Sequence, residues 1–541
     1  MNESIIVDPD PKRLIEGLRD TGYNFCTAVA DLIDNSIAAE AKKVEIRIDM
    51  DYFGNIDLMI ADNGCGMRKD ELIAAMKYGS SPSPNPRSLG KFGLGLKTAS
   101  TAFCKRLSVI SRSDGNNPGL KATWDLDHVA LKGAWELLIS EPESVELEFL
   151  ESTAPKERGT VVRWENVDRL LKEYNDPAGR HSRKALDRRI DELVEHISMV
   201  YQRFLNDSDH RETQKIQIWV NGVEIQPWDP FSEDEAEVAT EATIPLGHVD
   251  DEDILGEFTV RAFVLPRKGQ YSSDEIEKKA KISNDRQGFY IYRENRLIHH
   301  ADWLGMYSKE PHFSLLRVEF SFCADLDEAF QVDIKKSKIT FADELYRWLK
   351  DDFLPSPRRA AEHLYRKGIK AGVATIASGA HDVSNRGISN IEKDISKATV
   401  NVVDPEKDEV DISNSQGTTR IKLKIGKANK PGEVYVQPID SIDDGMLWQP
   451  AFIDEHQAVQ INTGHQFYRK VYIPNIQSSG ASPINVQGLD SFLWALAVSE
   501  LKAVNKDTRT HFEEIRYDVS RILRKLVEDL PMPNLEDNNA E

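Results

Sequence analysis

The spacing of hydrophobic residues in the first part of the chain switches repeatedly between the periods of helices and strands. Apolar residues recur at helical spacing between residues 11 and 41, which predicts helix. Apolar and polar residues alternate over residues 43–51, which predicts a strand. The same reasoning predicts a strand at 56–67 that ends in a glycine turn, a helix at 68–79, strands at 106–113 and 159–167, and a long helix at 186–205. We expect this helix to close a first domain.

The remainder of the chain is richer in strand patterns. Residues 216–225 predict a hairpin with an Asn-Gly turn. Further strands are predicted at 258–266, 287–295, 296–300 and 315–322, and helix is predicted from about 341 to 372. Residues 372–390 lose apolar periodicity, which predicts a linker. The last region shows strand patterns at 420–426, 433–439, 458–463 and 470–474, followed by helices at 489–504 and 511–530.

Composition narrows the class of protein. The 541 residues are 40% hydrophobic and 29% charged, which suffices for three or four domains. We expect neither a transmembrane helix nor a signal peptide, because no apolar run is long enough and the N-terminus lacks a basic region followed by an apolar one. The four cysteines show no C-x-x-C spacing, which argues against a zinc ribbon or a disulfide framework. These features predict a soluble, cytoplasmic protein with no membrane partner.

The charge is strongly acidic overall but unevenly distributed. The formal net charge of −21 gives no support for nucleic-acid binding. Much of the acidity lies in residues 232–257, which we interpret as a solvated loop. Two clusters are candidate basic surfaces, although a solvated helix face is the commoner explanation for each: Arg180, Arg183, Lys184, Arg188 and Arg189, and Arg521, Arg524 and Lys525.

A first motif with candidate chemistry, DLIDNSIAAEA, occupies residues 31–41 on a predicted helix. Asp31 and Asn35 are four residues apart, so their side chains emerge on one helix face. An amide oxygen can ligate Mg²⁺, and a carboxylate can orient or deprotonate an attacking water. Taken alone the pair is a weak signal, because such residues on a surface helix are usually only solvated.

A second motif, DNGCGM, occupies residues 62–67 and directly follows an apolar strand. Its glycines allow the backbone to approach a flat ligand. The Asp62 carboxylate can accept a proton from the amino group of adenine. In isolation, an ordinary turn capped by the aspartate side chain is the simpler interpretation.

A third motif, GKFGLGLKTAS, occupies residues 90–100. Gly90, Gly93 and Gly95 precede a predicted helix, whose first backbone N–H groups can bind an anion, and Lys97 adds a positive charge. The motif differs from a Walker A loop, because Leu96 separates the last glycine from the lysine. The preceding Pro- and Ser-rich residues, 80–89, are predicted to be a mobile loop.

In order and spacing, the three motifs resemble the GHKL ATPase superfamily, which includes DNA gyrase, heat-shock ninety chaperones, histidine kinases and MutL. The run GKFGLGLKTAS is especially similar to the MORC group, and GTVVRW (159–164) matches the Gly-Thr motif of these proteins. The resemblance implies a Bergerat-fold α/β sandwich over residues 1–205 that binds ATP and Mg²⁺.

The resemblance also assigns roles to individual residues. Asp31 falls on the general base, Asn35 on the Mg²⁺ ligand and Asp62 on the adenine acceptor. The other positions beside the nucleotide or in its phosphate-binding lid are Gly64, Gly66, Met67, Gly90, Lys91, Phe92, Gly93, Leu94, Gly95, Lys97 and Thr160.

A second part of the chain extends the resemblance. Residues 221–231 and 287–298 are similar to the MORC second domain, and residues 332–341 resemble the MutL segment that delivers a lysine to the γ-phosphate. An alignment on Phe341 puts Lys336 at that lysine, with Lys335 and Lys338 as competitors and an exposed basic strand end as the alternative. The implied fold class is α+β: the sandwich, an S5-like transducer domain (206–350), a helix and linker (351–410), and a separate α+β region of unknown role (411–541).

Two positions depart from the family pattern. The family usually has Glu where this chain has Asp31, and a misplacement of about 1 Å can cost on the order of 10²-fold in rate. We therefore expect slow hydrolysis. Asp34 is also acidic, but it points roughly a quarter-turn away from Asn35, so Asp31 is preferred as the base. Ala38 stands where MutL relatives carry Asp, which weakens a close MutL assignment.

These features predict a Mg-dependent ATPase that acts as an ATP-gated switch or homodimeric clamp. The resemblance suggests DNA or a DNA-associated protein as its target, in prokaryotic (antiviral) defence or genome maintenance. The alternative is a nucleotide-sensing scaffold with a protein client that hydrolyses ATP weakly or not at all. A histidine kinase is disfavoured because no histidine precedes His128. A topoisomerase subunit would need a partner chain to supply its cleavage tyrosine.

Overall fold

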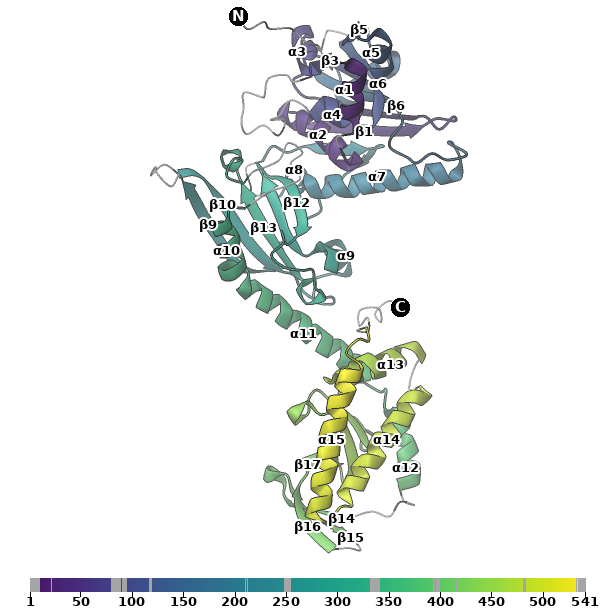
Figure 1. Cartoon of the computed structure of the whole chain (residues 1–541), viewed down its shortest axis with the longest axis vertical. Helices are drawn as coiled ribbons and strands as arrows, with labels where there is room; N and C mark the ends of the chain where they lie inside the picture. The colour runs from purple at the N-terminus through teal and green to yellow at the C-terminus, as the bar shows by residue number, and fades with distance from the viewer. Residues whose placement is uncertain are drawn as a thin grey trace, which may run out of the picture. The chain divides into compact units, whose positions relative to one another are not determined.

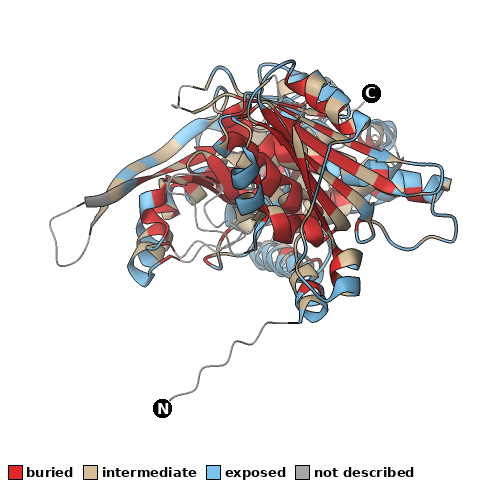
Figure 2. Ribbon diagram, turned by 90° about the horizontal axis from the view of Figure 1, so that it is seen from above, coloured by how far each residue is buried: buried red, intermediate tan, exposed pale blue. Residues whose placement is uncertain are grey.

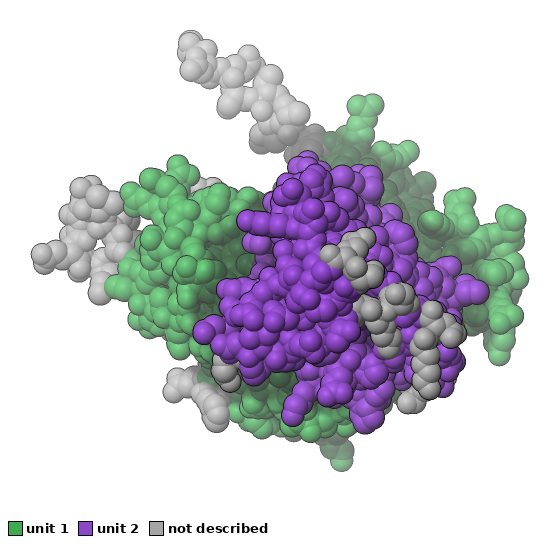
Figure 3. Space-filling view, turned by 90° about the horizontal axis from the view of Figure 1, so that it is seen from below, with its two compact units in different colours: residues 1–362 green, residues 363–541 purple. Residues whose placement is uncertain are grey.

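The computed structural model describes residues 10–20, 22–78, 89, 95–115, 119–209, 211, 213–247, 254–330, 341–392, 395, 399–414, 417–479, 483–531 and 533. The chain divides into two compact units, residues 1–362 and 363–541 (Figure 3). Each unit contains its own sheets, and each is described here by itself.

The first unit begins with an eight-stranded sheet in the order β5-β4-β3-β6-β2-β1-β7-β8. Figure 1 labels β1, β3, β5 and β6 of this sheet. The β1–β2 pair shows why these segments form strands: Val44, Ile46 and Ile48 of β1 are buried and alternate with more exposed polar residues. The strands are β1 (Lys43–Met50), β2 (Ile56–Asp62), β3 (Cys104–Arg112), β4 (Leu120–Asp125), β5 (Leu138–Ser140), β6 (Gly159–Val167), β7 (Gln217–Val220) and β8 (Val223–Glu224).

Helices pack on both faces of this sheet, and the buried residues gather between the two layers (Figure 2). One face is covered by α1 (Pro11–Arg19), α2 (Phe25–Ala38), α3 (Lys69–Met76), α4 (Gly95–Thr101), α5 (Leu126–Lys132), α7 (Arg180–Val200) and α8 (Gln202–Leu205). The other face is covered by α6 (Ser144–Thr153). The predicted α/β sandwich is confirmed. The predicted helix at 11–41 is two helices, because Gly22 has a φ of +69°, which an α-helix does not accommodate.

A second sheet of the first unit has the strand order β12-β11-β13-β10-β9. It is mixed, because β11 and β13 pair in parallel whereas the other pairs are antiparallel. Its strands are β9 (Glu237–Gly247), β10 (Ile254–Val264), β11 (Gly288–Arg293), β12 (Arg296–Asp302) and β13 (Leu316–Phe322), accompanied by α9 (Asp274–Ala280) and α10 (Asp343–Arg347). The expected α+β class of this part is confirmed, and its assignment as a transducer domain stays a prediction.

The acidic run at 232–257 contains a strand rather than only a loop. Residues 237–247 form β9, which pairs antiparallel with β10 at the edge of the second sheet. The loop interpretation is therefore wrong for these residues. The edge position explains the acidity, because exposed charges such as those of Glu237 and Glu241 are tolerated there and discourage pairing with other chains.

The predicted hairpin at 216–225 is present, but it belongs to the first sheet. Asn221 and Gly222 both have positive φ angles, of 48° and 77°, as a two-residue type I′ turn requires. Its first strand, β7, pairs in parallel with β1. The domain boundary between residues 205 and 206 stays a prediction.

Helices continue where a linker was predicted. A π-helical turn at Trp348–Phe353 leads into α11 (Pro355–Ala377), which is followed by α12 (Asp382–Ile391). The prediction of a linker over 372–390 is therefore wrong. The hydrophobic pattern did not reveal α12 because this helix buries a polar residue, Asn385, in place of an apolar one. The Asn385 side chain donates to the His381 and Val436 carbonyls and accepts from the Tyr435 N–H, so its polar groups are satisfied by backbone.

The second unit contains two small sheets covered by helices. The three-stranded sheet, in the order β14-β15-β16, comprises β14 (Thr399–Asp404), β15 (Glu409–Asn414) and β16 (Gly417–Lys422). The four-stranded sheet, in the order β17-β19-β20-β18, comprises β17 (Lys424–Gly426), β18 (Val436–Ile439), β19 (Trp448–Ile453) and β20 (His456–Asn462). The main helices after β20 are α13 (Ile473–Ser479), α14 (Ile484–Leu501) and α15 (Lys506–Leu526). The expected α+β class of this region is confirmed.

One predicted strand of the second unit, at 470–474, is helical. Residues Tyr468–Tyr472 form a π-helical turn that continues into α13. The rings of Tyr468 and Tyr472 stack with centroids 4.7 Å apart, and the Tyr468 hydroxyl contacts His381 Nε2 at 2.9 Å. Burial of two tyrosines four residues apart stabilises helix, whereas the short run KVYIP alone has the composition of a strand.

Candidate functional site

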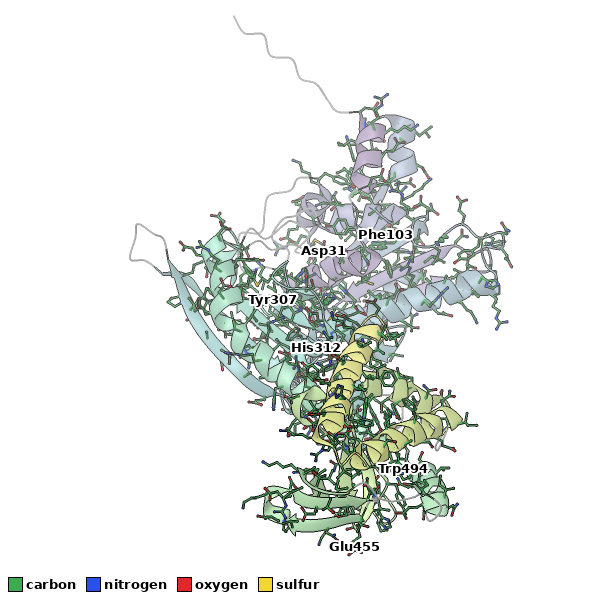
Figure 4. All side chains as sticks on the ribbon, turned by 60° about the horizontal axis from the view of Figure 1, so that its bottom comes forward. Asp31, Phe103, Tyr307, His312, Glu455 and Trp494 are labelled. Carbon is green, nitrogen blue, oxygen red and sulfur yellow. The ribbon has the colours of Figure 1, made fainter. Side chains whose placement is uncertain are left out.

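Asp31 and Asn35 project from α2, which packs against α4 (Figure 4 labels Asp31). The helix begins at Phe25 because the Asn24 side chain accepts from the Cys26 N–H at 2.8 Å. Asn35 is half-buried, and Asp31 is 8% exposed. The Tyr23 hydroxyl donates to Asp31 Oδ2 at 3.0 Å, so this carboxylate has a fixed orientation. Tyr23 was not predicted, because it precedes the helix and lies outside the motif.

The start of α4 lies directly beside Asp31. A Cβ atom on Gly95 would approach Asp31 Oδ2 to 3.2 Å and its Cβ to 3.5 Å. A larger residue would therefore push against the carboxylate. Gly95 is both the first residue of α4 and the last glycine of the third motif. It thus borders Asp31, the candidate general base.

Asp62 ends β2 and faces Thr160 of β6 across the ladder. Its Oδ2 accepts from Ser36 Oγ at 2.9 Å, and its Oδ1 accepts from the Gly64 N–H at 2.9 Å. Burial raises the pKa of Asp62, and these two hydrogen bonds oppose the rise. Because a carboxylate has about four acceptor positions, Asp62 retains capacity for a ligand donor. Ser36 was not predicted, although it stands next to Asn35 in the first motif.

The glycine turn after β2 is held by close backbone packing. A Cβ on Gly64 would lie 2.8 Å from Ala39, and a Cβ on Gly66, which has a φ of +64°, would lie 2.0 Å from the Arg112 carbonyl oxygen. The Met67 N–H donates to Ser111 Oγ at 2.8 Å. Ser111 Oγ in turn lies 2.9 Å from Thr160 Oγ1. This chain of contacts brings the predicted residues Asp62, Gly64, Gly66, Met67 and Thr160 together.

Lys97 lies on α4, but its side chain is buried. Its Nζ donates to the Ala75 carbonyl of α3 at 2.9 Å, and the residue is 2% exposed. Burial lowers the pKa of Lys97 to about 8. In this conformation the ammonium group faces α3, so a contact with phosphate stays a prediction.

The remaining predicted positions lie outside the described residues. They are Gly90, Lys91, Phe92, Gly93 and Leu94 of the glycine-rich run, and Lys336 with its competitors Lys335 and Lys338.

Asp34 faces away from the candidate site and connects α2 to the second sheet. Its Oδ1 accepts from the Tyr201 hydroxyl and from Arg296 Nε, each at 2.8 Å. Arg296 begins β12 and is 5% exposed, while Asp34 is fully buried. A second buried pair, Arg203 with Glu319 at 2.8 Å, crosses the same interface. The residue beside Asn35 is thus fixed by the second sheet, a contact that the sequence motifs did not reveal.

The two predicted basic surfaces are partly engaged within the chain. Arg183 donates to the Ala178 and Asp51 carbonyls, Arg189 pairs with Glu192, and Arg524 donates to the Gly445 carbonyl. These contacts favour a structural role for those three arginines. Arg180, Lys184 and Arg188 line a hollow at the start of α7.

The residues at the site fit a nucleotide with Mg²⁺. Asn35 and Asp31 supply hard oxygen donors one helical turn apart, the type that Mg²⁺ accepts beside phosphates. The described residues contain no group of three or more His, Cys, Asp or Glu side chains placed to hold a metal by themselves. Asp62 supplies a buried acceptor at the end of a central strand. Together with the eight-stranded sheet and its helical layer, this arrangement is that of a Bergerat-type domain.

Comparison with known proteins identifies the same class. Residues 23–160 match the family described as "Histidine kinase-, DNA gyrase B-, and HSP90-like ATPase". The chain is 32% identical to ATPase MORC2B of Mus musculus over 91 residues, which are 16% of this chain and 9% of that protein. It is 32% identical to the DNA mismatch repair protein MutL of Aeromonas salmonicida (strain A449) over 181 residues, 32% of this chain and 25% of that protein. The chain therefore contains a GHKL-type ATPase domain, and the resemblance to MORC and MutL proteins is confirmed.

Each of these matches spans a quarter or less of the relative's own length. Among solved structures, the chain is similar to the "Crystal Structure of N terminal domain of a DNA repair protein", with 17% identity and a TM-score of 0.39 over 66% of this chain and 99% of that one. In the part of the chain that the structure describes, no helix is long and apolar enough to cross a membrane.

Proposed function

We propose that this chain binds ATP with Mg²⁺ at the α2 site, hydrolyses it slowly, and uses the nucleotide to switch conformation. The observation that carries the proposal is the 2.9 Å hydrogen bond from Ser36 to Asp62. Because Ser36 follows Asn35 on α2, this bond fixes the helix that carries the candidate metal ligand against the strand end that carries the candidate adenine acceptor.

The proposed roles follow from the chemistry of each side chain. Asn35 Oδ1 would hold the Mg²⁺ ion, which supplies charge neutralisation at the phosphates. Asp62 would accept from the adenine amino group, with Gly64, Gly66, Met67 and Thr160 beside it. Asp31 would orient the attacking water and accept its proton. The Tyr23 hydroxyl holds the Asp31 carboxylate toward α4, whose first residue is Gly95.

The switch would depend on segments on both sides of the site. We propose that residues 90–95 and Lys97 close over the phosphates, that Lys336 of the transducer reaches the γ-phosphate, and that two chains then associate as a homodimer. ATP can shift the equilibrium between the open and closed states of the chain only if it binds the closed state more tightly than the open one. The buried Asp34–Arg296 pair supports coupling, because it connects the helix that carries Asn35 to the second sheet.

The proposed target is DNA or a DNA-associated protein. This proposal rests on the relatives, one of which is named a DNA mismatch repair protein. Within that class, a function in prokaryotic, antiviral defence or in genome maintenance, in the cytoplasm, is our proposal from the MORC-like sequence.

One observation favours the alternative, a nucleotide-sensing scaffold with a protein client. Asp31 is one methylene shorter than the glutamate usual in the family, and its Oδ2 already accepts from Tyr23 at 3.0 Å. This hydrogen bond occupies one of the acceptor positions of the carboxylate that an attacking water could use. Both features slow hydrolysis without weakening nucleotide binding.

Phosphate release distinguishes the two proposals. The wild-type chain is expected to release phosphate from ATP slowly with Mg²⁺ and not at all with excess chelator, because the phosphates then lack their neutralising ion. Asn35→Ala is expected to be inactive in both conditions. Phosphate release that persists in the Asn35→Ala variant, or that does not depend on Mg²⁺, contradicts the assignment of Asn35 as the Mg²⁺ ligand. No release by a wild-type chain that binds ATP favours the scaffold.

Homodimerisation is tested by the particle mass in solution. A non-hydrolysable ATP analogue with Mg²⁺ is expected to double the mass of the wild-type chain and to leave the Asn35→Ala chain unchanged. An unchanged mass for a wild-type chain saturated with the analogue would count against the clamp.

A further inference from the structure

A groove in the second unit concentrates positive charge in an otherwise acidic chain. It lies between the edge strands β16 and β17 and the first half of α15, and its volume is about 360 Å³. Its lining includes six cationic side chains, against the carboxylates of Glu500 and Glu513: Arg420, Lys422, Lys424, Lys506, Arg509 and Arg516. The groove therefore attracts anions, although the whole chain carries a net charge of −21.

The cations form two rows that face each other. The first row lies on the extended segment 420–424, in which exposed cations alternate with less exposed apolar residues. One face of this segment therefore carries Arg420, Lys422 and Lys424. Alternate residues in a strand are about 6.7 Å apart. The opposite row lies along α15, where Lys506 and Arg509 occupy the first turn and Arg516 follows two turns later. Rows of this length suit a polymer that carries regularly spaced charge.

Some of these charges are compensated within the chain, and others are not. Arg420 pairs with Asp411 at 2.8 Å, Lys424 with Asp408 at 3.0 Å and Arg516 with Glu500 at 3.1 Å. By contrast, no ion pair among the described residues involves Lys422, Lys506 or Arg509, although Asp408, the partner of Lys424, also attracts Lys422 electrostatically.

Two opposing effects act on the charge of Glu500. Burial raises the pKa of Glu500 to about 7, and Arg516 only partly opposes this rise. Burial therefore disfavours the charged form of Glu500, whereas its ion pair with Arg516 favours that form.

We propose that this groove binds the phosphate backbone of a nucleic acid, with Lys422, Lys506 and Arg509 as its principal phosphate contacts. The site would hold the proposed DNA target of the ATP-driven switch, so in this respect it rests on the proposed function. The binding itself needs no nucleotide.

The lining favours a nucleic acid over an acidic protein. It offers little apolar surface to peptide side chains, because Leu423 and Leu501 are 3% and 1% exposed and belong to the core, which leaves only the half-buried Ile421 and Pro450. Its lining contains no aromatic residue on which a base could stack. The remaining recognition is electrostatic. Two phosphate steps of one DNA strand advance about 6.8 Å along the helix axis, which is close to the spacing of alternate residues in the row Arg420, Lys422 and Lys424. The expected binding is therefore independent of base sequence.

The test is the salt dependence of DNA binding by the full chain, measured by the fluorescence anisotropy of a labelled duplex of about 40 base pairs over about 50–300 mM salt. The triple variant Lys422→Gln, Lys506→Gln, Arg509→Gln is expected to bind at least about tenfold more weakly at 100 mM salt. Its slope of log affinity against log salt is expected to fall by about 3, one for each phosphate contact removed.

A matched variant removes three cations elsewhere in the second unit: Lys367→Gln, Lys370→Gln and Lys407→Gln, all exposed and none of them in the lining of the groove. It is expected to keep the wild-type affinity and slope. Both variants are expected to bind ATP like the wild type, so a failure of the ATP site is distinguishable from a failure of the groove. The proposal is overturned if the wild type binds no duplex, if the two triple variants behave alike, or if polyglutamate of equal charge competes as well as unlabelled DNA.

Discussion

Asp31→Asn is expected to reduce the rate of ATP turnover by about 10²–10⁴-fold, the range typical of a lost general base. The affinity for ATP is expected to stay within about threefold of the wild type, because Asn35, Asp62 and the glycine turn are untouched. Asparagine has nearly the same size as aspartate and can still accept from the Tyr23 hydroxyl, so Gly95 and α4 keep their positions. Single-turnover phosphate release and equilibrium ATP binding measure the two quantities separately.

Two further variants control this experiment. Asp31→Glu restores the longer carboxylate and is expected to keep turnover at or above the wild-type rate. Tyr23→Phe removes the hydrogen bond to Asp31 without removing the base and is expected to change the rate far less than Asp31→Asn. If Asp31→Asn hydrolyses ATP at the wild-type rate, Asp31 is not the base.

Arg296→Met is expected to destabilise the first unit by about 3–5 kcal/mol, because it leaves the buried Asp34 carboxylate without its charged partner. The melting temperature of this unit is expected to fall by about 5–10 °C. ATP affinity is expected to fall as well, since Asn35 adjoins Asp34 on α2 and the helix loses its contact with β12. Thermal unfolding followed by circular dichroism and an ATP titration measure the two effects.

The double variant Asp34→Asn, Arg296→Met separates the lost charge pair from a packing defect. It removes both charges, and the asparagine can still accept from the Tyr201 hydroxyl, which donates to Asp34 in the wild type at 2.8 Å. It is expected to recover most of the lost stability. A melting temperature of Arg296→Met within about 1 °C of the wild type would show that the buried pair contributes little.

The candidate site was largely predictable because its residues lie in short motifs. The four-residue spacing of Asp31 and Asn35 places both on one face of α2, and the strand that ends at Asp62 pairs with the strand that carries Thr160. The alternation of Val44, Ile46 and Ile48 likewise fixed β1. Local periodicity is sufficient where one face of an element is buried and the other is exposed.

Contacts between distant segments were not predictable in this way. Arg296 lies 262 residues from Asp34 in the sequence, and only the packing of the second sheet against α2 and α7 brings them together. Helix α12 was missed for a related reason, since Asn385 is buried and satisfied by backbone groups of β18 and the residue before it. A polar residue with long-range partners does not produce the hydrophobic pattern of a buried helix.

The Asp62 carboxylate offers the most direct test of the central claim, that the α2 site binds ATP. Calorimetric titration of ATP and Mg²⁺ into the wild-type chain is expected to show one site per chain. Asp62→Asn keeps the size of the side chain but replaces an acceptor with a donor, so it is expected to bind at least about tenfold more weakly, the effect of losing a hydrogen bond to a charged group. The control Asp57→Asn, on the same strand but paired with Arg163, is expected to bind like the wild type. Absence of saturable binding by the wild type, or equal affinity of Asp62→Asn and the wild type, would contradict the account.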